Sequence, residues 1–100
     1  MLNLTSKQRA YLKSMAHDIT PIFQVGKNGV TPDLTTGIDE ALEAREIIKI
    51  SVLQNCMMQP QEICQTLSER TKSTPVQIIG KRIVLYRPHK TNPKITLPKA

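Results

Sequence analysis

The sequence predicts a single α/β domain with the element order α-β-α-β-α-β-β, in which the strands form a four-stranded mixed sheet. Three observations predict it. Apolar residues at helical spacing follow capping residues in three segments, and short β-branched runs lie between them. Two final runs, 76–79 and 82–87, are separated by only two residues, which is typical of an antiparallel hairpin. A chain of 100 residues leaves room for one domain.

The first helix is expected to begin after Thr5. Gln8 stands three residues later, which is the sequence pattern of a capping box. One side of this helix collects the larger apolar side chains, Leu4, Tyr11, Leu12 and Met15. Because Pro21 disfavours helical geometry in the residue before it, the helix should end by residues 18–20.

A short buried strand is predicted at 22–25, followed by the tetrapeptide 26–29 and a second helix. Thr31 and Pro32 have the character of an N-cap and a first-turn proline. Gly37 lies inside this helix, where glycine costs about 1 kcal/mol relative to alanine, and close packing is the one reason we can suggest for it.

The second half of the chain predicts a strand, a helix and a hairpin. The strand covers 47–53, the helix runs from 59 to about 71, and Gly80-Lys81 supplies the turn between strands 76–79 and 82–87. We therefore expect the folded domain to occupy residues 1–87. The tail, 88–100, has three prolines and three lysines with few apolar residues, so we expect it to be disordered or loosely extended.

Composition excludes several classes of protein. The longest aliphatic-aromatic run, 83–86, is far shorter than the ~20 residues that cross a bilayer, and the first residues do not resemble a secretory signal. Cys56 and Cys64 fit neither a redox pair nor a zinc site, so we interpret them as ordinary thiols and expect a cytoplasmic location. No metal, cofactor or small-molecule substrate is expected.

Charge is unevenly distributed along the chain, whose formal net charge is +6. Residues 1–30 contain four basic and one acidic side chain, residues 31–70 three basic and seven acidic, and residues 71–100 seven basic and none acidic. Basic ends with an acidic middle allow one positive face, as in proteins that bind polyanions, of which nucleic acid is the commonest in a cell.

Catalytic patterns are absent from the sequence. There is no G-x-S-x-G elbow and no phosphate loop of the G-x-x-x-x-G-K-[ST] type. His17 and His89 lie near the ends of predicted elements. Four acids on the second predicted helix are interpreted as its solvated face: Asp39, Glu40, Glu43 and Glu46. We therefore predict that the protein is not an enzyme.

The tetrapeptide Gly26-Lys27-Asn28-Gly29 joins a strand to a helix N-terminus, where free backbone N–H groups and the helix dipole favour anions. Glycines allow a close approach of the backbone, Lys27 adds a positive charge, and Asn28 tolerates left-handed geometry. KH domains use a G-x-x-G loop of this type to clamp a nucleic-acid backbone.

Four segments, 4–13, 24–31, 38–50 and 76–87, together resemble the YhbY-type RNA-binding family, the stand-alone form of the CRM (chloroplast RNA splicing and ribosome maturation) domain. The resemblance implies a fold similar to the C-terminal domain of translation initiation factor 3. It also implies association with precursors of the large ribosomal subunit, and it assigns the RNA-contacting loop to Gly26, Lys27, Asn28 and Gly29.

Further RNA-binding residues are chosen here on charge. Lys7, Arg9 and Lys13 on the first helix are expected to adjoin the loop, and Arg82 and Arg87 to extend the basic surface. The resulting hypothesis is a monomeric, non-catalytic protein that grips the backbone of structured rRNA.

Two alternatives stay open from the sequence. One is a protein-interaction module that docks on a ribosomal protein or assembly factor through its acidic second helix. The other is a DNA-binding module, which ranks lower because no helix presents a cluster of base-reading residues.

Overall fold

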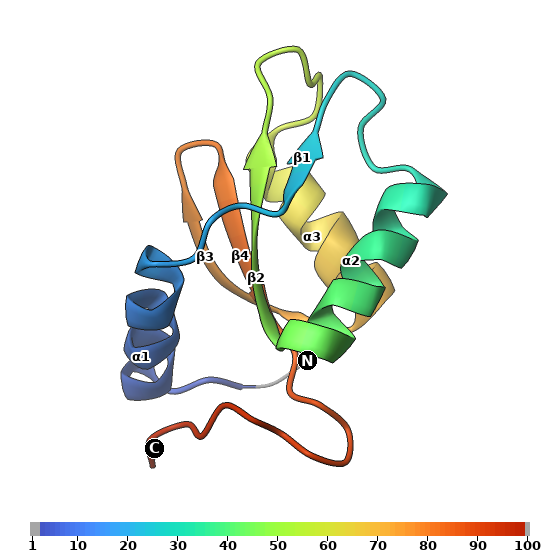
Figure 1. The fold of residues 1–100 in the computed structure, drawn as a ribbon. Helices are drawn as coiled ribbons and strands as arrows, with labels where there is room; N and C mark the ends of the chain where they lie inside the picture. Colours follow the sequence, from blue (N-terminus) through green and yellow to red (C-terminus); the bar gives the residue numbers. More distant parts are fainter. Residues whose placement is uncertain (1–2, 100) are drawn as a thin grey trace.

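The sheet carries helices on both faces (Figure 1). The computed structural model describes residues 3–99. Its elements are α1 (Ser6–His17), β1 (Phe23–Val25), α2 (Pro32–Arg45), β2 (Ile47–Val52), α3 (Pro60–Thr71), β3 (Thr74–Ile79) and β4 (Arg82–Tyr86). The α/β class, the element order and the four-stranded mixed sheet are as the sequence predicts.

The strands lie in the order β1-β2-β4-β3. The short strand β1 pairs parallel to β2, whereas β2 with β4 and β4 with β3 are antiparallel. Parallel pairing of β1 and β2 brings their carboxyl ends to one edge of the sheet. The β3–β4 turn reaches the same edge, because Ser51 near the end of β2 pairs with Arg82 at the start of β4.

Two apolar clusters hold the layers together, and strand β2 contributes to both. Ile48, Ile50 and Val52 pack with α2 and α3 on one face, and Ile47 packs with α1 on the other. This follows from the alternation of side chains along a strand. Lys49 and Ser51 fall on the α1 face, where α1 does not cover the whole sheet.

Helices α1 and α2 each begin at a threonine whose side chain caps the first turn. Thr5 caps α1, with the Gln8 amide donating to Thr5 Oγ1 at 3.2 Å and the Gln8 side chain accepting from the Thr5 amide at 3.1 Å. Thr31 Oγ1 likewise accepts from the Leu34 amide at 3.1 Å. Both capping predictions are confirmed.

Strand β3 differs from its predicted range, because it begins at Thr74 rather than Val76. Pro75 lies within it, which is tolerated because β3 is an edge strand. The register also shifts between Pro75 and Gln77, so Val76 forms a bulge against β4. Local sequence could not predict this, since a bulge is a property of the strand pair.

Gly37 has a packing reason. A Cβ at this position would lie 3.1 Å from Cε1 of Phe23, so the helix can approach the ring only where a side chain is missing. The close packing suggested by the sequence is confirmed, and it seats strand β1 against α2.

Glu46 joins α2 to β2 as a single connecting residue. Its φ of +68° is in the left-handed half of conformational space, which is costly for a residue with a side chain. The side chain is 1% exposed. Its Oε2 accepts from the His89 amide at 2.8 Å, and its Oε1 accepts from the amides of Lys94 and Ile95 at 2.7 and 3.0 Å.

The tail has no helix or strand in its described part, residues 88–99. It contacts the domain beyond Glu46 as well. Ile95 and Leu97 pack against the α1 cluster, and Gln8 Nε2 donates to the carbonyl of Pro98 at 3.1 Å. The domain boundary at 87 and the flexibility of the tail stay predictions.

Protonation of Glu46 should loosen these contacts. Burial raises the pKa of this carboxyl, but the three backbone donors and the nearby His89 together outweigh burial, so the pKa is lowered. A lowered folded pKa means that the stabilisation is present at neutral pH. It is lost as pH falls below about 4.3, the ordinary glutamate value, and through the lowered folded pKa. The protection factors for amide hydrogen exchange at Lys94 and Ile95, taken relative to the intrinsic exchange rate at each pH, should therefore fall over that acidic range.

Glu46→Gln supplies the matched test at neutral pH. A glutamine nitrogen would face one of the amide donors, so we expect a loss of roughly 1–3 kcal/mol in the free energy of unfolding and faster tail exchange. Glu40→Gln, at an exposed position of α2, is the control and should change neither. Equal behaviour of the two variants would contradict the role given to Glu46.

Candidate nucleic-acid interface

Three loops meet at one edge of the sheet, and we call residues 26–30, 53–59 and 80–81 the loop edge (Figure 1). The first two follow the parallel strands β1 and β2, and the third is the β3–β4 turn. The Val52 amide donates to the Lys81 carbonyl at 2.7 Å, and the Leu53 amide to the Val25 carbonyl at 2.9 Å. Pairing of the strands therefore holds the three loops side by side.

The G-x-x-G tetrapeptide forms a tight turn at this edge. The Gly29 amide donates to the Gly26 carbonyl at 3.0 Å, and Lys27 and Asn28 between them are exposed. Gly29 has the left-handed conformation, with φ +64°, whereas Asn28 does not. The turn thus requires left-handed geometry at the second glycine and not at Asn28, which tolerates that geometry but does not adopt it.

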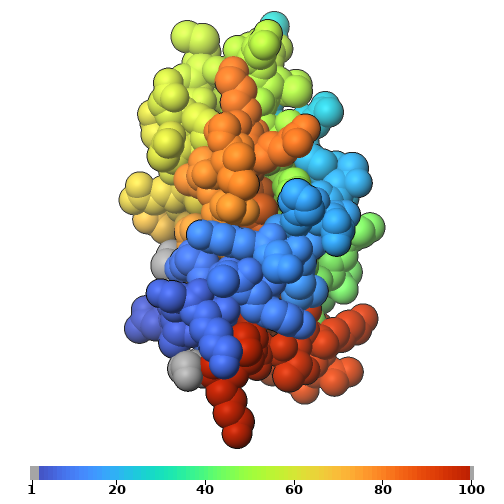
Figure 2. Space-filling model, turned by 90° about the vertical axis from the view of Figure 1, so that its left-hand side faces the viewer, coloured from blue at the N-terminus to red at the C-terminus, as the bar shows by residue number. Residues whose placement is uncertain are grey.

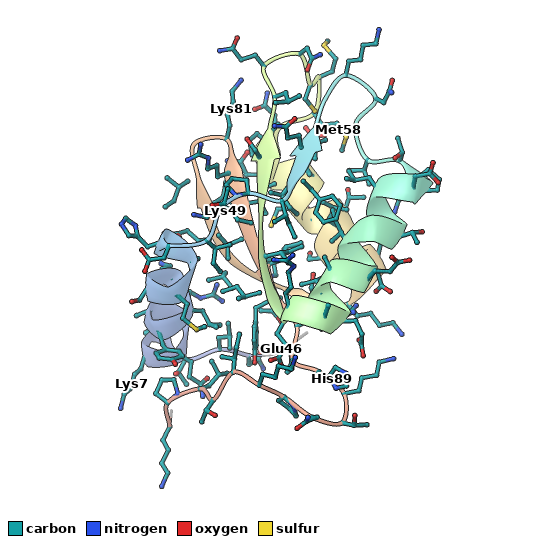
Figure 3. The ribbon with its side chains drawn as sticks, in the orientation of Figure 1. Lys7, Glu46, Lys49, Met58, Lys81 and His89 are labelled. Atoms are coloured by element: carbon teal, nitrogen blue, oxygen red, sulfur yellow. The ribbon has the colours of Figure 1, made fainter. Side chains whose placement is uncertain are left out.

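A second loop supports the turn. A Cβ on Gly29 would lie 3.0 Å from the Met58 sulfur, and one on Gly26 would lie 3.5 Å from Asn55 Oδ1. Met58 is thus a packing partner of the turn (Figure 3), while its neighbour Met57 is 89% exposed. Met58 reaches the turn because the pairing of β1 with β2 brings the two loops together.

Helix ends and lysines at the loop edge favour an anion, whereas Asp33 and Glu62 in the first turns of α2 and α3 oppose one. Helices α2 and α3 both begin there, so the positive ends of two helix dipoles point toward it. Thr31 caps α2, whereas Gln59 makes no side-chain cap bond to α3. The three loops contain Lys27 and Lys81 and no acidic residue, and Arg82 follows directly.

Lys13 and Arg82 lie together, away from the G-x-x-G turn. Both line a pocket on the α1 face of the sheet. Lys7, at the start of α1, lies at the other end of the molecule from Lys81 (Figure 3). Charge alone led us to expect all three basic residues of α1 near the loop. Of the three, Lys13 is the one that lies toward the loop end of the sheet.

Arg9 is anchored to the β3 bulge. Its Nη1 donates to the carbonyls of Pro75 and Val76 at 2.7 and 3.1 Å. These two carbonyls lie where the β3–β4 register shifts, so the guanidinium contacts the sheet at its irregular point. The geometry gives Arg9 the role of fastening α1 to the sheet.

Arg87 lies on the opposite side of the sheet from α1. Its guanidinium donates to Asp39 Oδ1 at 2.6 Å, to the Thr71 carbonyl at 2.7 Å and to Glu43 Oε2 at 3.3 Å. The side chain is 13% exposed. The structure thus does not bring Arg87 together with the other basic candidates, since it pairs with the acids of α2.

Arg9→Ala should cost roughly 1–2 kcal/mol in the free energy of unfolding, because two carbonyls of the bulge lose a charged donor. Urea denaturation measures it. Lys7→Ala removes an equal charge from an exposed position of the same helix and is expected to leave stability within about 0.5 kcal/mol. A phosphate-binding Arg9 with no structural role would give equal stabilities for the two variants.

Residues 3–99 give little support for a metal site, a reactive thiol or a membrane-spanning helix. No group of three or more His, Cys, Asp or Glu side chains there is arranged to hold a metal ion. Cys56 and Cys64 are free thiols, and burial raises the pKa of Cys64, which makes its thiolate less accessible. None of the described helices is long and apolar enough to span a bilayer.

Known proteins are similar to this chain both in sequence and in fold. The chain is 52% identical over 95 residues to "Probable RNA-binding protein YqeI" of Bacillus subtilis, covering 95% of this chain and 99% of that protein. It is 37% identical over 99 residues to an "RNA-binding protein" of Haemophilus influenzae, covering 99% of each. The solution structure of SAV1595 from Staphylococcus aureus, 51% identical, matches 96% of this chain and 100% of its own with a TM-score of 0.79.

Fold and loop edge define a small α/β protein with a cationic loop surface. The chain belongs to the CRS1/YhbY (CRM) domain family, whose match covers residues 4–87. The resemblance found in the sequence is confirmed over the same range. Both of these relatives are RNA-binding proteins by name.

Proposed function

We propose that this protein binds structured rRNA through the G-x-x-G turn and acts, without catalysis, in assembly of the large ribosomal subunit. The observation that carries the proposal is the exposed turn at the start of α2, with Lys27 and Asn28 at its tip. Family membership supports RNA as the ligand. The assembly role and the association with ribosome precursors rest on the family resemblance, and the cytoplasmic location rests on the two unpaired cysteines of the sequence.

Phosphate contacts are the proposed source of affinity. The backbone N–H groups of the turn, together with Lys27 and Lys81, lie at the edge where α2 and α3 begin. Phosphates carry no base identity, so specificity would come from RNA shape and the 2′-hydroxyl.

The acidic helix gives less support to a protein-docking function. Asp39 and Glu43 form ion pairs with Arg87, and Glu46 is buried under the tail. Of the four acids that motivated this alternative, Glu40 is exposed without such a contact among those described. Three of the four acids therefore have partners within the molecule, which leaves less acidic surface for docking another protein.

Lys27→Ala/Asn28→Ala should weaken binding to an rRNA fragment by about tenfold or more, because charge-assisted contacts are lost. The melting temperature should stay within about 2 °C, since both side chains are exposed. Lys90→Ala/Asn92→Ala removes the same two residue types from exposed tail positions and is the matched control. If stability fell together with affinity, the turn would be structural rather than functional.

The salt dependence of binding tests the electrostatic mechanism. Contacts to about four phosphates predict a slope of about −3 for log affinity against log salt concentration. Fluorescence anisotropy with a labelled rRNA fragment measures it, and a flat profile would reject the mechanism. Competition by duplex DNA as strong as by RNA would instead favour a DNA-binding module.

Crosslinking in cell extract tests the biological target. Sequencing of the attached fragments should recover rRNA of the large subunit and its precursors, and much less of it with Lys27→Ala/Asn28→Ala. Fragments spread evenly over cellular RNA would contradict the assembly role while leaving RNA binding intact.

A further inference from the structure

Helix α1 packs on one face of the sheet but does not reach the part of that face nearest the loop edge. The register joins one residue from each strand into a row across this face: Gln24, Ser51, Arg82 and Ile79. The next row toward the centre contains Lys49, Val84 and Gln77. Helix α1 begins to cover the sheet at the second of these rows, where Leu12 and Ala16 pack in one cluster with Val84, Ile47 and Tyr86, and it leaves the first row open.

A basic pocket of about 370 Å³ lies between the end of α1 and this open part of the sheet. Its lining is Lys13, Ala16, His17, Lys49, Gln77, Ile79, Arg82 and Val84. Three permanent cations and a histidine thus face one hollow with no acidic side chain in its wall. Figure 2 shows this side of the molecule, with α1 (blue) across the middle and the β3–β4 hairpin (orange) above it.

The pocket also has an apolar part. Ile79 is 61% exposed at the edge of the sheet, although isoleucine is among the residues most often buried. Val84 and Ala16 form the floor beside it. Cations around an apolar floor suit a ligand that joins negative charge to a flat apolar ring.

We propose that this basic pocket is a second RNA-contacting site, which receives an unpaired nucleotide of the strand that the G-x-x-G turn grips. This proposal rests on the proposed RNA-binding function. Lys13, Lys49 and Arg82 bind the phosphates that flank the nucleotide, and its base or ribose packs on Ile79. Lys49 and Ile79 were not singled out by the sequence, because only the sheet register brings them together.

Size and position favour an unpaired nucleotide over a helix. The volume is at the lower end of the roughly 300–1,000 Å³ of small-molecule sites, and a paired duplex cannot enter such a recess. The open row ends at Gln24, two residues before Gly26. A single strand can therefore run across the sheet from β3 to β1 and reach the turn.

Lys49→Gln/Arg82→Gln tests the pocket. Removing two phosphate contacts should reduce the magnitude of the salt slope by roughly 1.4, the value for two contacts to a single strand. Affinity for an rRNA hairpin with an unpaired bulge should fall at least about tenfold. Arg45→Gln/Arg70→Gln is the control, because it makes the same change in net charge at exposed positions of α2 and α3, across the sheet.

Ile79→Ser separates packing from charge. It should weaken binding to the bulged hairpin severalfold without changing the salt slope, and leave binding to the fully paired hairpin unchanged. Thermal melts of each variant show whether it is folded, and Ile79→Ala, which keeps an apolar side chain, should give an intermediate loss.

The outcomes distinguish the two proposals. Absence of salt-dependent RNA binding by the unsubstituted protein overturns both. If Lys27→Ala/Asn28→Ala weakens binding but Lys49→Gln/Arg82→Gln behaves like its control, the pocket proposal alone is overturned. Uridine monophosphate is the last probe: if it binds as tightly as a short oligouridylate, the pocket is a small-molecule site and the proposal fails.

Discussion

The buried carboxylate of Glu46 is the contact on which much of the tertiary arrangement depends. It lies where α2 ends and β2 begins, so its strained backbone sets the angle between a helix and the central strand. Its carbonyl accepts a hydrogen bond from the Arg87 amide at 2.7 Å, and its carboxylate accepts hydrogen bonds from three backbone amides of the tail. One residue thereby links α2, β2, the end of β4 and the tail.

Placement of α1 follows from this link. The tail that Glu46 holds continues under α1 (Figure 2), with Ile95 and Leu97 in the same apolar cluster as Leu12. Arg9 holds the helix from the other side through the β3 bulge. With two attachments at its lower part, α1 covers the lower rows of the sheet and leaves the upper rows open. The basic pocket exists because the helix stops there.

Sequence reasoning succeeded where the cause is local. Thr5 and Thr31 start helices through bonds to amides three residues away, and Gly80 takes its positive φ of +55° within a two-residue turn. It failed where a contact joins distant segments. Charge alone could not show that Arg87 pairs with Asp39, 48 positions away, or that Glu46, one of four similar acids on a predicted helix, is buried.

The basic residues therefore divide into two groups by what surrounds them. Arg9 and Arg87 donate to carbonyls and carboxylates inside the molecule, and guanidinium suits this because its fork can serve several acceptors at once. Lys13, Lys27 and Lys81 are exposed, as expected of strongly hydrated ammonium groups. Among the arginines chosen as RNA-binding candidates, Arg82 differs from Arg9 and Arg87, because it is exposed and lies where the loop edge meets the pocket. A planar, multidentate donor at that junction can contact two successive phosphates, which is what a strand passing from the sheet to the turn would require.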